Sequence, residues 1–272
     1  MIDLLIGNDT YSAPTKLDEC NEWQLATYAR EFILNRSALF TELPDGTVTI
    51  KNRLRYEVAM MRLLHASIGC EWKLFAKISA EQKHYLVYDA KLLEFYFKDS
   101  FTQAPAIAFN GLIGPKNHYQ LTAEEFSFAD TAYMAYHKSE SVQALNTFVA
   151  VIMRKPKLLA WLFNPIDKRE EFDKNTIENR LPIVATSTTD CKLALWFWYH
   201  KYRAELPNKY PFAFSSSNES KAASNGWLDV LLSSAENGTF GNYQTTCKTQ
   251  HHLVFTDLNR RIANAKTKPN AQ

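Results

Sequence analysis

Glycine is scarce in this chain, with eight residues in 272. None of them forms GxxxxGK, GxGxxG or GxSxG, which are the glycine patterns of P-loop NTPases, Rossmann-type dehydrogenases and α/β-hydrolases. The HExxH pattern of many zinc proteases is absent as well. The sequence therefore argues against these four enzyme classes, and we assign no catalytic residue from it.

Cysteines and long apolar runs are also few. The four cysteines are dispersed and form no CxxC pair, which is typical of reduced thiols and not of a disulfide framework. No stretch approaches the ~18 apolar residues of a membrane span. The opening residues, MIDLLIGNDT, lack the basic segment of a signal peptide. We therefore expect a cytoplasmic protein with no membrane partner.

Charge of one sign is not in excess, because the net charge is +2. Residues 1–150 hold 14 Lys and Arg against 18 Asp and Glu, whereas residues 151–272 hold 17 against 11. The second half is thus mildly basic, well below the charge of a dedicated nucleic-acid domain. Nucleic-acid binding through this basic half is kept as an alternative that the sequence does not favour.

What the chain does contain is helical periodicity, clearest in residues 121–154. Two sets of apolar residues each lie on one face of a helix, separated by the polar segment HKSES. Thr122 and Glu125 have the spacing of a capping box, and Ser139 is placed to cap the second helix. We expect an antiparallel helix pair over residues 122–138 and 140–154. The two sets are Phe126, Ala129, Tyr133 and Tyr136, and Val142, Leu145, Val149 and Ile152.

Similar patterns continue along the chain and predict a mainly α fold, a multi-helix globular protein with antiparallel helix pairs and a few short strands. The strands are expected in residues 1–13 and beside the Asp45-Gly46 turn, with residues 72–78 a strand or a buried connector. Residues 214–225, rich in Ser and Asn, are interpreted as a mobile loop. The remaining predicted helices cover 21–35, 52–67, 79–98, 158–163, a segment that stops before Pro182, 189–206 before Pro207, 227–234 and 251–265.

The apolar side chains of the 52–67 helix recur at helical spacing, and we expect them to form one apolar stripe along the helix. Gly69 is expected to end that helix, and the 79–98 helix is apolar nearly all round, which is typical of a central helix. Residues 100–120 break the pattern, so we predict an N-terminal helical region at 1–110 and a C-terminal one at 111–272, with one continuous domain as the alternative. The stripe consists of Leu54, Val58, Met61 and Leu64 or His65.

Two constellations could in principle carry chemistry. Cys247 and His251 lie four residues apart, a spacing that on a helix places both on one face, and His252 lies beside them, but no further ligand stands at a workable spacing for zinc. We interpret them as surface or packing residues on a terminal helix and expect no metal and no cofactor. Cys20 and Cys191 lie near predicted helix starts, where a thiolate would be stabilised, and are interpreted as inert thiols.

The carboxylates form a second possible constellation. Acidic residues at helix starts offset the helix dipole, and this explains them without catalysis. Asp167 and Glu170 are interpreted as another helix cap, and Arg154, Lys155 and Lys157 as cations at a helix C-terminus. A hydrolase with dispersed carboxylates remains an alternative. The carboxylates in question are Glu124, Glu125, Glu170, Glu171 and Asp173.

The aromatic segment 196–202 is the strongest candidate for an interaction surface. Aromatic side chains stack on bases and sugars and supply much of the energy of protein interfaces. Five aromatics in seven residues cannot all share one helix face, so core packing is the favoured interpretation of the segment and an interaction surface is the next choice. Our candidates for contact with a partner are Trp196, Trp198, Tyr202 and, further along, Trp227.

Three stretches resemble a family of tail-assembly-chaperone-like proteins from phages and prophages of Bacteroidetes-type bacteria. They are LDECNEWQLATYARE, LTAEEFSFADTAYMAYHKSESVQALNTFVAVIMR and FGNYQTTCKTQHHLVFTDLNRRIA, which together cover about a quarter of the chain. The resemblance implies a non-enzymatic cytoplasmic helper that acts on tail proteins, with the tape-measure protein or the tail tube as partner. It implies no catalytic residues.

Overall fold

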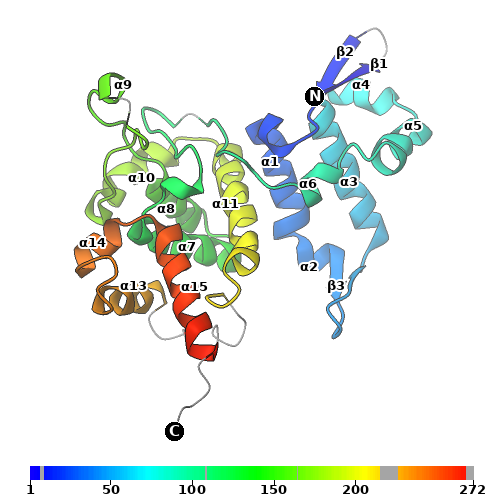
Figure 1. Cartoon of the computed structure of the whole chain (residues 1–272). Coiled ribbons are helices and arrows are strands. Elements are labelled where there is room, and N and C mark those ends of the chain that lie inside the picture. Colours follow the sequence, from blue (N-terminus) through cyan, green and yellow to red (C-terminus); the bar gives the residue numbers. More distant parts are fainter. Residues whose placement is uncertain (7–8, 108, 164, 215–225, 268–272) are drawn as a thin grey trace. The chain divides into compact units, whose positions relative to one another are not determined.

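The computed structural model describes residues 1–6, 9–107, 109–163, 165–214 and 226–267. The protein is 62% helical, and the sheets within the described residues are two hairpins of two strands each, which confirms the predicted mainly α class (Figure 1). No helix in these ranges is long and apolar enough to cross a membrane. The chain forms two compact units: unit 1 comprises Met1–Pro105 and Thr188–Phe197, and unit 2 comprises Ala106–Ser187 and Trp198–Gln272.

Unit 1 begins with the antiparallel hairpin β1–β2, in which Leu4 lies opposite Tyr11. A second hairpin, β3–β4, turns at the predicted Asp45-Gly46 dipeptide, where Gly46 has φ +81°. Compact units need not be independent domains, so the predicted division at residues 110 and 111 stays a prediction. The elements of unit 1 are β1 Ile2–Ile6, β2 Asp9–Ala13, the 3-10 turn Leu17–Glu19, α1 Glu22–Tyr28, the π-helical segment Ala29–Leu34, α2 Arg36–Leu39, β3 Phe40–Glu42, β4 Val48–Ile50, α3 Arg53–Ile68, α4 Trp72–Lys77, α5 Ala80–His84, the π-helical segment Tyr85–Asp89, α6 Glu94–Lys98 and the first part of α11 Thr189–Lys209.

Helix ends in unit 1 follow local chemistry. Asn21 caps α1, and Ser79 and Gln82 form the predicted capping box at α5, because a side-chain oxygen satisfies an otherwise unpaired N–H group of the first turn. Gly69 ends α3 at φ +73°, the left-handed conformation that glycine adopts without steric penalty.

Three predictions for unit 1 are wrong. Leu54 and Val58 are exposed, because α3 buries the face that carries Ala59, Met60 and Leu63. Residues 72–77 are helix and not strand. The single helix expected over 79–98 is instead interrupted after the π-helical segment, where Lys91 has φ +51°.

Unit 2 is built around α7 and α8, which pack against each other as the predicted helix pair. Phe126, Tyr133, Leu145 and Val149 are all buried, as expected. The elements of unit 2 are the 3-10 turn His118–Gln120, α7 Ala123–Ser139, α8 Val142–Ile152, α9 Ala160–Phe163, the 3-10 turn Lys174–Thr176, α10 Ile177–Ala185, the later part of α11 Thr189–Lys209, α13 Trp227–Glu236, α14 Tyr243–Lys248 and α15 His251–Thr267.

Some helix boundaries in unit 2 differ from those expected. Thr122 and Glu125 form the predicted capping box of α7, but Ser141, not Ser139, is the N-cap of α8. Pro182 and Pro207 lie inside α10 and α11, so both helices continue past the proline that was expected to stop them. The segment interpreted as a mobile loop at 214–225 lies, from residue 215 on, outside the described residues.

Candidate functional site

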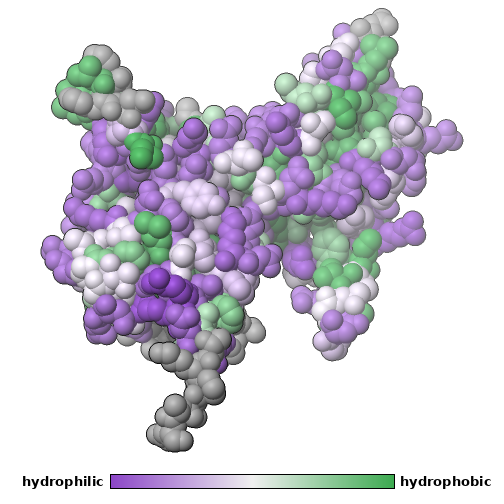
Figure 2. Space-filling view, in the orientation of Figure 1, coloured by the Kyte–Doolittle hydropathy of each residue, from purple (hydrophilic) through white to green (hydrophobic). Residues whose placement is uncertain are grey.

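An apolar loop, which the structure describes at residues 158–163, 165 and 166, leaves the body of unit 2 between α8 and α10. Its exposed side chains are Leu158 at 90%, Ile166 at 86%, Leu162 at 58% and Leu159 at 42% of full accessibility. The loop carries the short helix α9 at the margin of unit 2, where apolar colouring reaches the surface (Figures 1 and 2). Buried apolar surface stabilises a fold and exposed apolar surface does not, so these side chains need another explanation.

The backbone is closed where the loop begins and ends, and we call residues 154–157 and 168–170 the neck. The N–H of Lys157 donates to the carbonyl of Lys168 at 2.7 Å, and the N–H of Glu170 donates to the carbonyl of Lys155 at 2.8 Å. Pro156 and Arg169 pair as an isolated antiparallel bridge between these two bonds. The neck is therefore a short two-stranded ladder.

Alternation along the neck separates its side chains into two faces. Arg154 and Arg169, together with Asp167 just before the second strand, have the parity that points into unit 2, and both arginines are buried. Pro156 opposite Arg169 has the same parity and is exposed. Lys155, Lys157, Lys168 and Glu170 have the opposite parity and are exposed or half-buried. The arginines of the inner face are thus buried, and the outer face carries three lysines and one glutamate.

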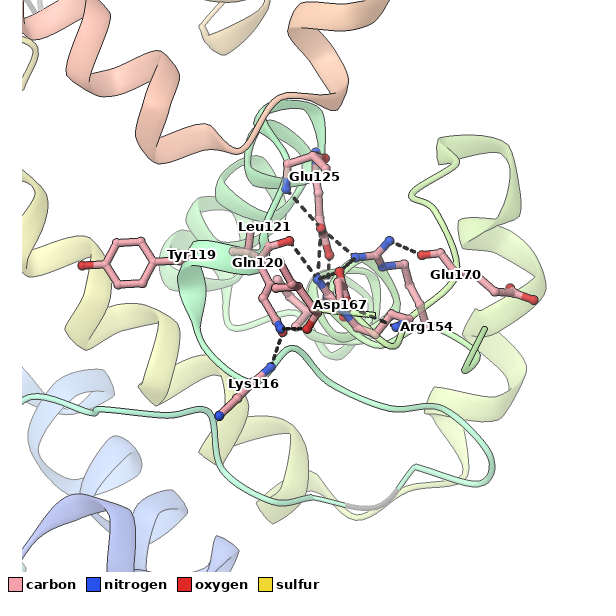
Figure 3. Close-up of polar contacts among 12 residues, drawn as sticks. Lys116, Tyr119, Gln120, Leu121, Glu125, Arg154, Asp167 and Glu170 are labelled. Atoms are coloured by element: carbon pink, nitrogen blue, oxygen red, sulfur yellow. Dashed lines mark hydrogen bonds and ion pairs between the residues drawn. The ribbon is translucent and has the colours of Figure 1, made fainter. Parts of the chain in front are cut away.

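Four charged side chains meet inside unit 2, and we call Glu125, Arg154, Asp167 and Arg169 the ion cluster (Figure 3). Glu125 Oε1 accepts from Arg169 Nη1 at 2.7 Å, and its Oε2 accepts from Arg154 Nη2 at 3.0 Å. Asp167 Oδ2 accepts from Arg169 Nη2 at 2.9 Å and from Arg154 Nη2 at 3.1 Å. Each arginine therefore bridges both carboxylates.

Burial opposes the charges of Arg154, Asp167 and Arg169, and their neighbours in the cluster act against that effect. For Arg169, burial lowers the pKa, but Glu125 and Asp167 outweigh it and the pKa is raised. For Asp167, burial raises the pKa, but the hydrogen bonds and charge of Arg169 outweigh it and the pKa is lowered. Burial is the larger influence on Arg154, whose pKa is lowered. Two positive and two negative charges together leave no net buried charge.

Backbone carbonyls complete the coordination of the guanidinium groups. Arg169 donates to the carbonyls of Ile152 at 2.8 Å and Gln120 at 3.2 Å, and Arg154 donates to the carbonyl of Glu170. The amide of Gln120 also donates to the carbonyl of Ile166 at 2.5 Å, which ties the end of the apolar loop to the turn before α7 (Figure 3). The ion cluster thus fixes both strands of the neck to α7 and α8.

The geometry of the ion cluster suits it to fixing the neck in place and not to proton transfer. A general base needs a free oxygen within reach of a substrate proton, and both carboxylates here are engaged by arginine donors. One interpretation from the sequence is corrected by this geometry: Asp167 does not form a helix cap with Glu170, because it is drawn into the ion cluster. Arg154 follows the C-terminus of α8, as interpreted, and its guanidinium group is buried in the same cluster.

We compared the whole chain with known proteins. No family model, no curated protein and no solved structure matches it. The function of the site is therefore inferred from the geometry of this chain.

The four aromatic candidates for partner contact lie elsewhere in the fold. Trp196, Trp198 and Tyr202 are buried, so they cannot touch a partner without rearrangement. Trp227 is half-buried, and its indole N–H donates to Asp130 Oδ2 at 2.8 Å. Their role at an interface stays a prediction, but in this fold the first three are core residues.

Asp130 collects several donors in the same part of unit 2. Its Oδ1 accepts from Arg203 Nε at 2.7 Å and from the Tyr199 hydroxyl at 3.4 Å. With Trp227 on the other oxygen, this carboxylate links α7, α11 and α13. Asp130 therefore resembles Glu125: its carboxylate joins separate elements, and both of its oxygens accept hydrogen bonds from other side chains.

Cys247 and His251 do not share a helix, because Cys247 lies in α14 and His251 begins α15. Of the two histidines, His251 has the surroundings of a packing residue. His251 is buried; its Nδ1 donates to the carbonyl of Leu121 at 2.9 Å, and its Nε2 accepts from the Tyr202 hydroxyl. Burial lowers the pKa of His251 to about 3 and that of His118 to about 4, so both are neutral at pH 7. In the described ranges, no three His, Cys, Asp or Glu side chains are grouped to hold a metal ion.

The remaining candidates are dispersed. Glu124 lies 3.9 Å from Lys174, Glu171 lies 3.1 Å from Lys248, and Asp173 caps the 3-10 turn Lys174–Thr176. Burial raises the pKa of the Cys20 thiol to about 12, which disfavours a reactive thiolate. Cys191 accepts a hydrogen bond from Thr188.

Unit 1 has an apolar groove of about 590 Å³ between β1 and the α4–α5 region. Its lining is mostly aliphatic, with one lysine and one glutamate at its edge. The groove is a second place where apolar side chains meet solvent, as the green surface in Figure 2 shows. It is lined by Leu4, Leu5, Ile6, Leu74, Lys77, Ile78, Glu81, Gln82, Tyr85 and Leu86.

The sequence did not identify the apolar loop or the ion cluster. The segment 158–163 was predicted as an apolar helix, which leaves open whether it is buried or exposed. One signal was present: KLLAWLFNPIDK places six large apolar residues between lysines within a basic stretch. No local pattern pairs Glu125 with Arg169, which is 44 residues further along.

Proposed function

We propose that this protein is a non-enzymatic protein–protein interaction module that presents the apolar loop to a partner. The observation that carries the proposal is the exposure of Leu158, Leu162 and Ile166 on a loop whose neck is fixed by buried charges. Exposed apolar groups supply binding energy when a partner removes them from water, and a fixed neck reduces the entropy lost on binding.

The partner is proposed from the resemblance described above. Tail-assembly-chaperone-like proteins act on tail components, so the tape-measure protein and the tail tube are our first candidates, and the protein would act as a phage or prophage tail-assembly factor. The occupied carboxylates Glu125, Asp130 and Asp167 support the non-enzymatic role over a hydrolase with dispersed carboxylates.

Co-expression with the neighbouring tail genes tests the proposal. We expect the tape-measure or tail-tube protein to co-purify with the wild-type protein and to be lost from Leu158→Ser/Ile166→Ser. The matched control is Leu54→Ser/Leu253→Ser, which removes two exposed leucines from α3 and α15 and should retain the partner.

A gene deletion separates the general role from the specific one. Loss of normal tails in the deletion strain supports a tail-assembly factor. If normal tails form and no tail protein co-purifies, the assembly role is refuted. Equal co-purification with both double variants would instead move the interaction away from the apolar loop.

A further inference from the structure

We infer that the apolar loop inserts into an apolar groove of a partner protein whose rim is acidic. The inference rests on the proposed function and specifies the chemistry of the partner surface. Its two parts come from different residues: the leucines and Ile166 of the loop define the floor of the groove, and the lysines of the neck define its rim.

The rim follows from charge. Lys155, Lys157 and Lys168 share the outer face of the neck, and no ion pair is recorded for any of them within the part of the chain that the structure describes. Four acidic side chains line the same pocket as Lys157. Asp167 is held by the two arginines of the ion cluster, Glu124 and Glu171 lie beside Lys174 and Lys248, and Glu170 supplies one charge against three. The base of the loop is therefore positive, and an acidic rim complements it.

The shape of the loop indicates what kind of surface it contacts. Leu159 has φ +58°, a conformation that non-glycine residues rarely adopt, and two hydrogen bonds hold the turn around it: Ala160 N–H to Lys157 at 3.1 Å and Leu162 N–H to Leu159 at 2.9 Å. A turn held in a strained conformation at residues 157–162 is useful for fitting a groove of matching shape. A fluid lipid surface requires no such fit, so we favour a protein partner over a membrane.

Site-specific photocrosslinking tests the inference in cells that carry the gene. The probe is benzoylphenylalanine at position 158, and the comparison position is 54, an exposed leucine of α3. We expect crosslinks from position 158 to a protein, at residues that lie in an apolar segment flanked by Asp or Glu. In Lys155→Glu/Lys157→Glu/Lys168→Glu the crosslink yield should fall roughly fivefold or more, and raising the salt concentration should lower the wild-type yield, because both changes weaken attraction between charges.

A control variant isolates the position of the charges from their number. Lys73→Glu/Lys91→Glu/Lys138→Glu changes the net charge equally at exposed sites outside the neck and should leave the yield within about twofold. If charge reversal at the neck disturbs folding, replacing the same three lysines by glutamine should still give an intermediate loss of yield.

Two kinds of result overturn the inference. If position 158 gives adducts with lipid only, or no more protein adduct than position 54, the loop does not insert into a groove of a protein. If the crosslink yield and its salt dependence are the same in the charge-reversal variant as in the wild type, the partner groove does not have an acidic rim. If tail proteins co-purify equally with wild type and with that variant, the interaction module stands and the inference alone fails, whereas absence of both crosslinks and co-purification removes both.

Discussion

Helix α7 is held by two neighbours through different forces. Its contact with α8 is apolar: Leu145, Phe148 and Val149 of α8 are buried, and a pocket beside the two helices is lined by Phe128 and by small residues of both. Its contact with the neck is ionic, through Glu125. Apolar packing tolerates changes of similar volume, whereas a buried ion pair strongly penalises loss of one partner. Substitutions on the face of α7 that packs on α8 should therefore be tolerated better than substitution of Glu125 on the face that contacts the neck.

The largest effect is expected when the ionic contact is broken. Glu125→Gln leaves two buried guanidinium groups with Asp167 as their only carboxylate, and the free energy of unfolding should fall by about 3–5 kcal/mol. Urea denaturation measures the loss. The control is the adjacent Glu124→Gln, whose partner Lys174 is 3.9 Å away, and its loss should stay below about 1 kcal/mol. A similar small loss for both variants would mean that Glu125 does not hold the neck.

The apolar contact should be somewhat less sensitive. Leu145→Ala empties a fully packed position and should lower the free energy of unfolding by ~2–5 kcal/mol, depending on how far α7 and α8 close the cavity. Val142→Ala removes an exposed side chain from the same helix and should change it by less than about 0.5 kcal/mol. Equal effects of the two variants would show that Leu145 is not packed in the helix pair.

A third test measures how the free energy of unfolding depends on pH. The apolar contact between α7 and α8 contains no group that titrates in the range used. The pKa of His251 is lowered to about 3 in the fold, so the unfolded chain takes up the proton first, and stability falls as the pH drops below the unfolded pKa of about 6.5. His251 alone should remove about 2 kcal/mol at pH 5. Asp167, whose pKa is lowered, contributes stability above its unfolded pKa that is lost as the pH falls through its folded pKa.

The measurement is denaturation of the wild type and of His251→Gln from pH 7 to pH 4. Between pH 6.5 and 5 the variant should show a shallower decline, because glutamine does not titrate. His118, with a pKa of about 4, should account for part of the decline that remains. Parallel curves for the two proteins would show that His251 is not buried as a neutral side chain.

The smallest effect on stability is expected at the loop. Leu158→Ser/Ile166→Ser should change the free energy of unfolding by no more than about 0.5 kcal/mol, because both side chains face solvent. Thermal denaturation checks this. A clear destabilisation would place these residues in the core and would remove the observation behind the proposed function.

These contrasts explain which features the sequence could predict. Caps are local: Asn21, Ser79 and Thr122 each bond to residues three positions away, so a short window contains the whole interaction. Gly69 likewise ends α3 through its own backbone freedom. The hairpin of α7 and α8 was predictable because its periodicity and its short connection are local as well.

The features that sequence reasoning missed depend on distant partners. Asp167 and Arg154 were given the roles that acids and bases usually have at helix ends, since nothing nearby indicates that Glu125 and Arg169 complete the cluster. Pro182 and Pro207 were expected to stop helices that continue through them. Whether an apolar segment such as 158–163 faces the core or solvent is decided by the rest of the fold, which its own residues do not encode.

One helix described above has a consequence for how the protein is made. The first part of α11, up to Phe197, belongs to unit 1, where Asp190 pairs with Arg30 and Phe197 packs on Tyr28 at 4.8 Å between ring centroids. A ribosome adds roughly 5–20 residues per second, and it must add about ninety more after Pro105 before this part is finished. During those seconds the nascent chain around Tyr28 lacks its final cover, so unit 1 can be completed only after much of unit 2 has been synthesised.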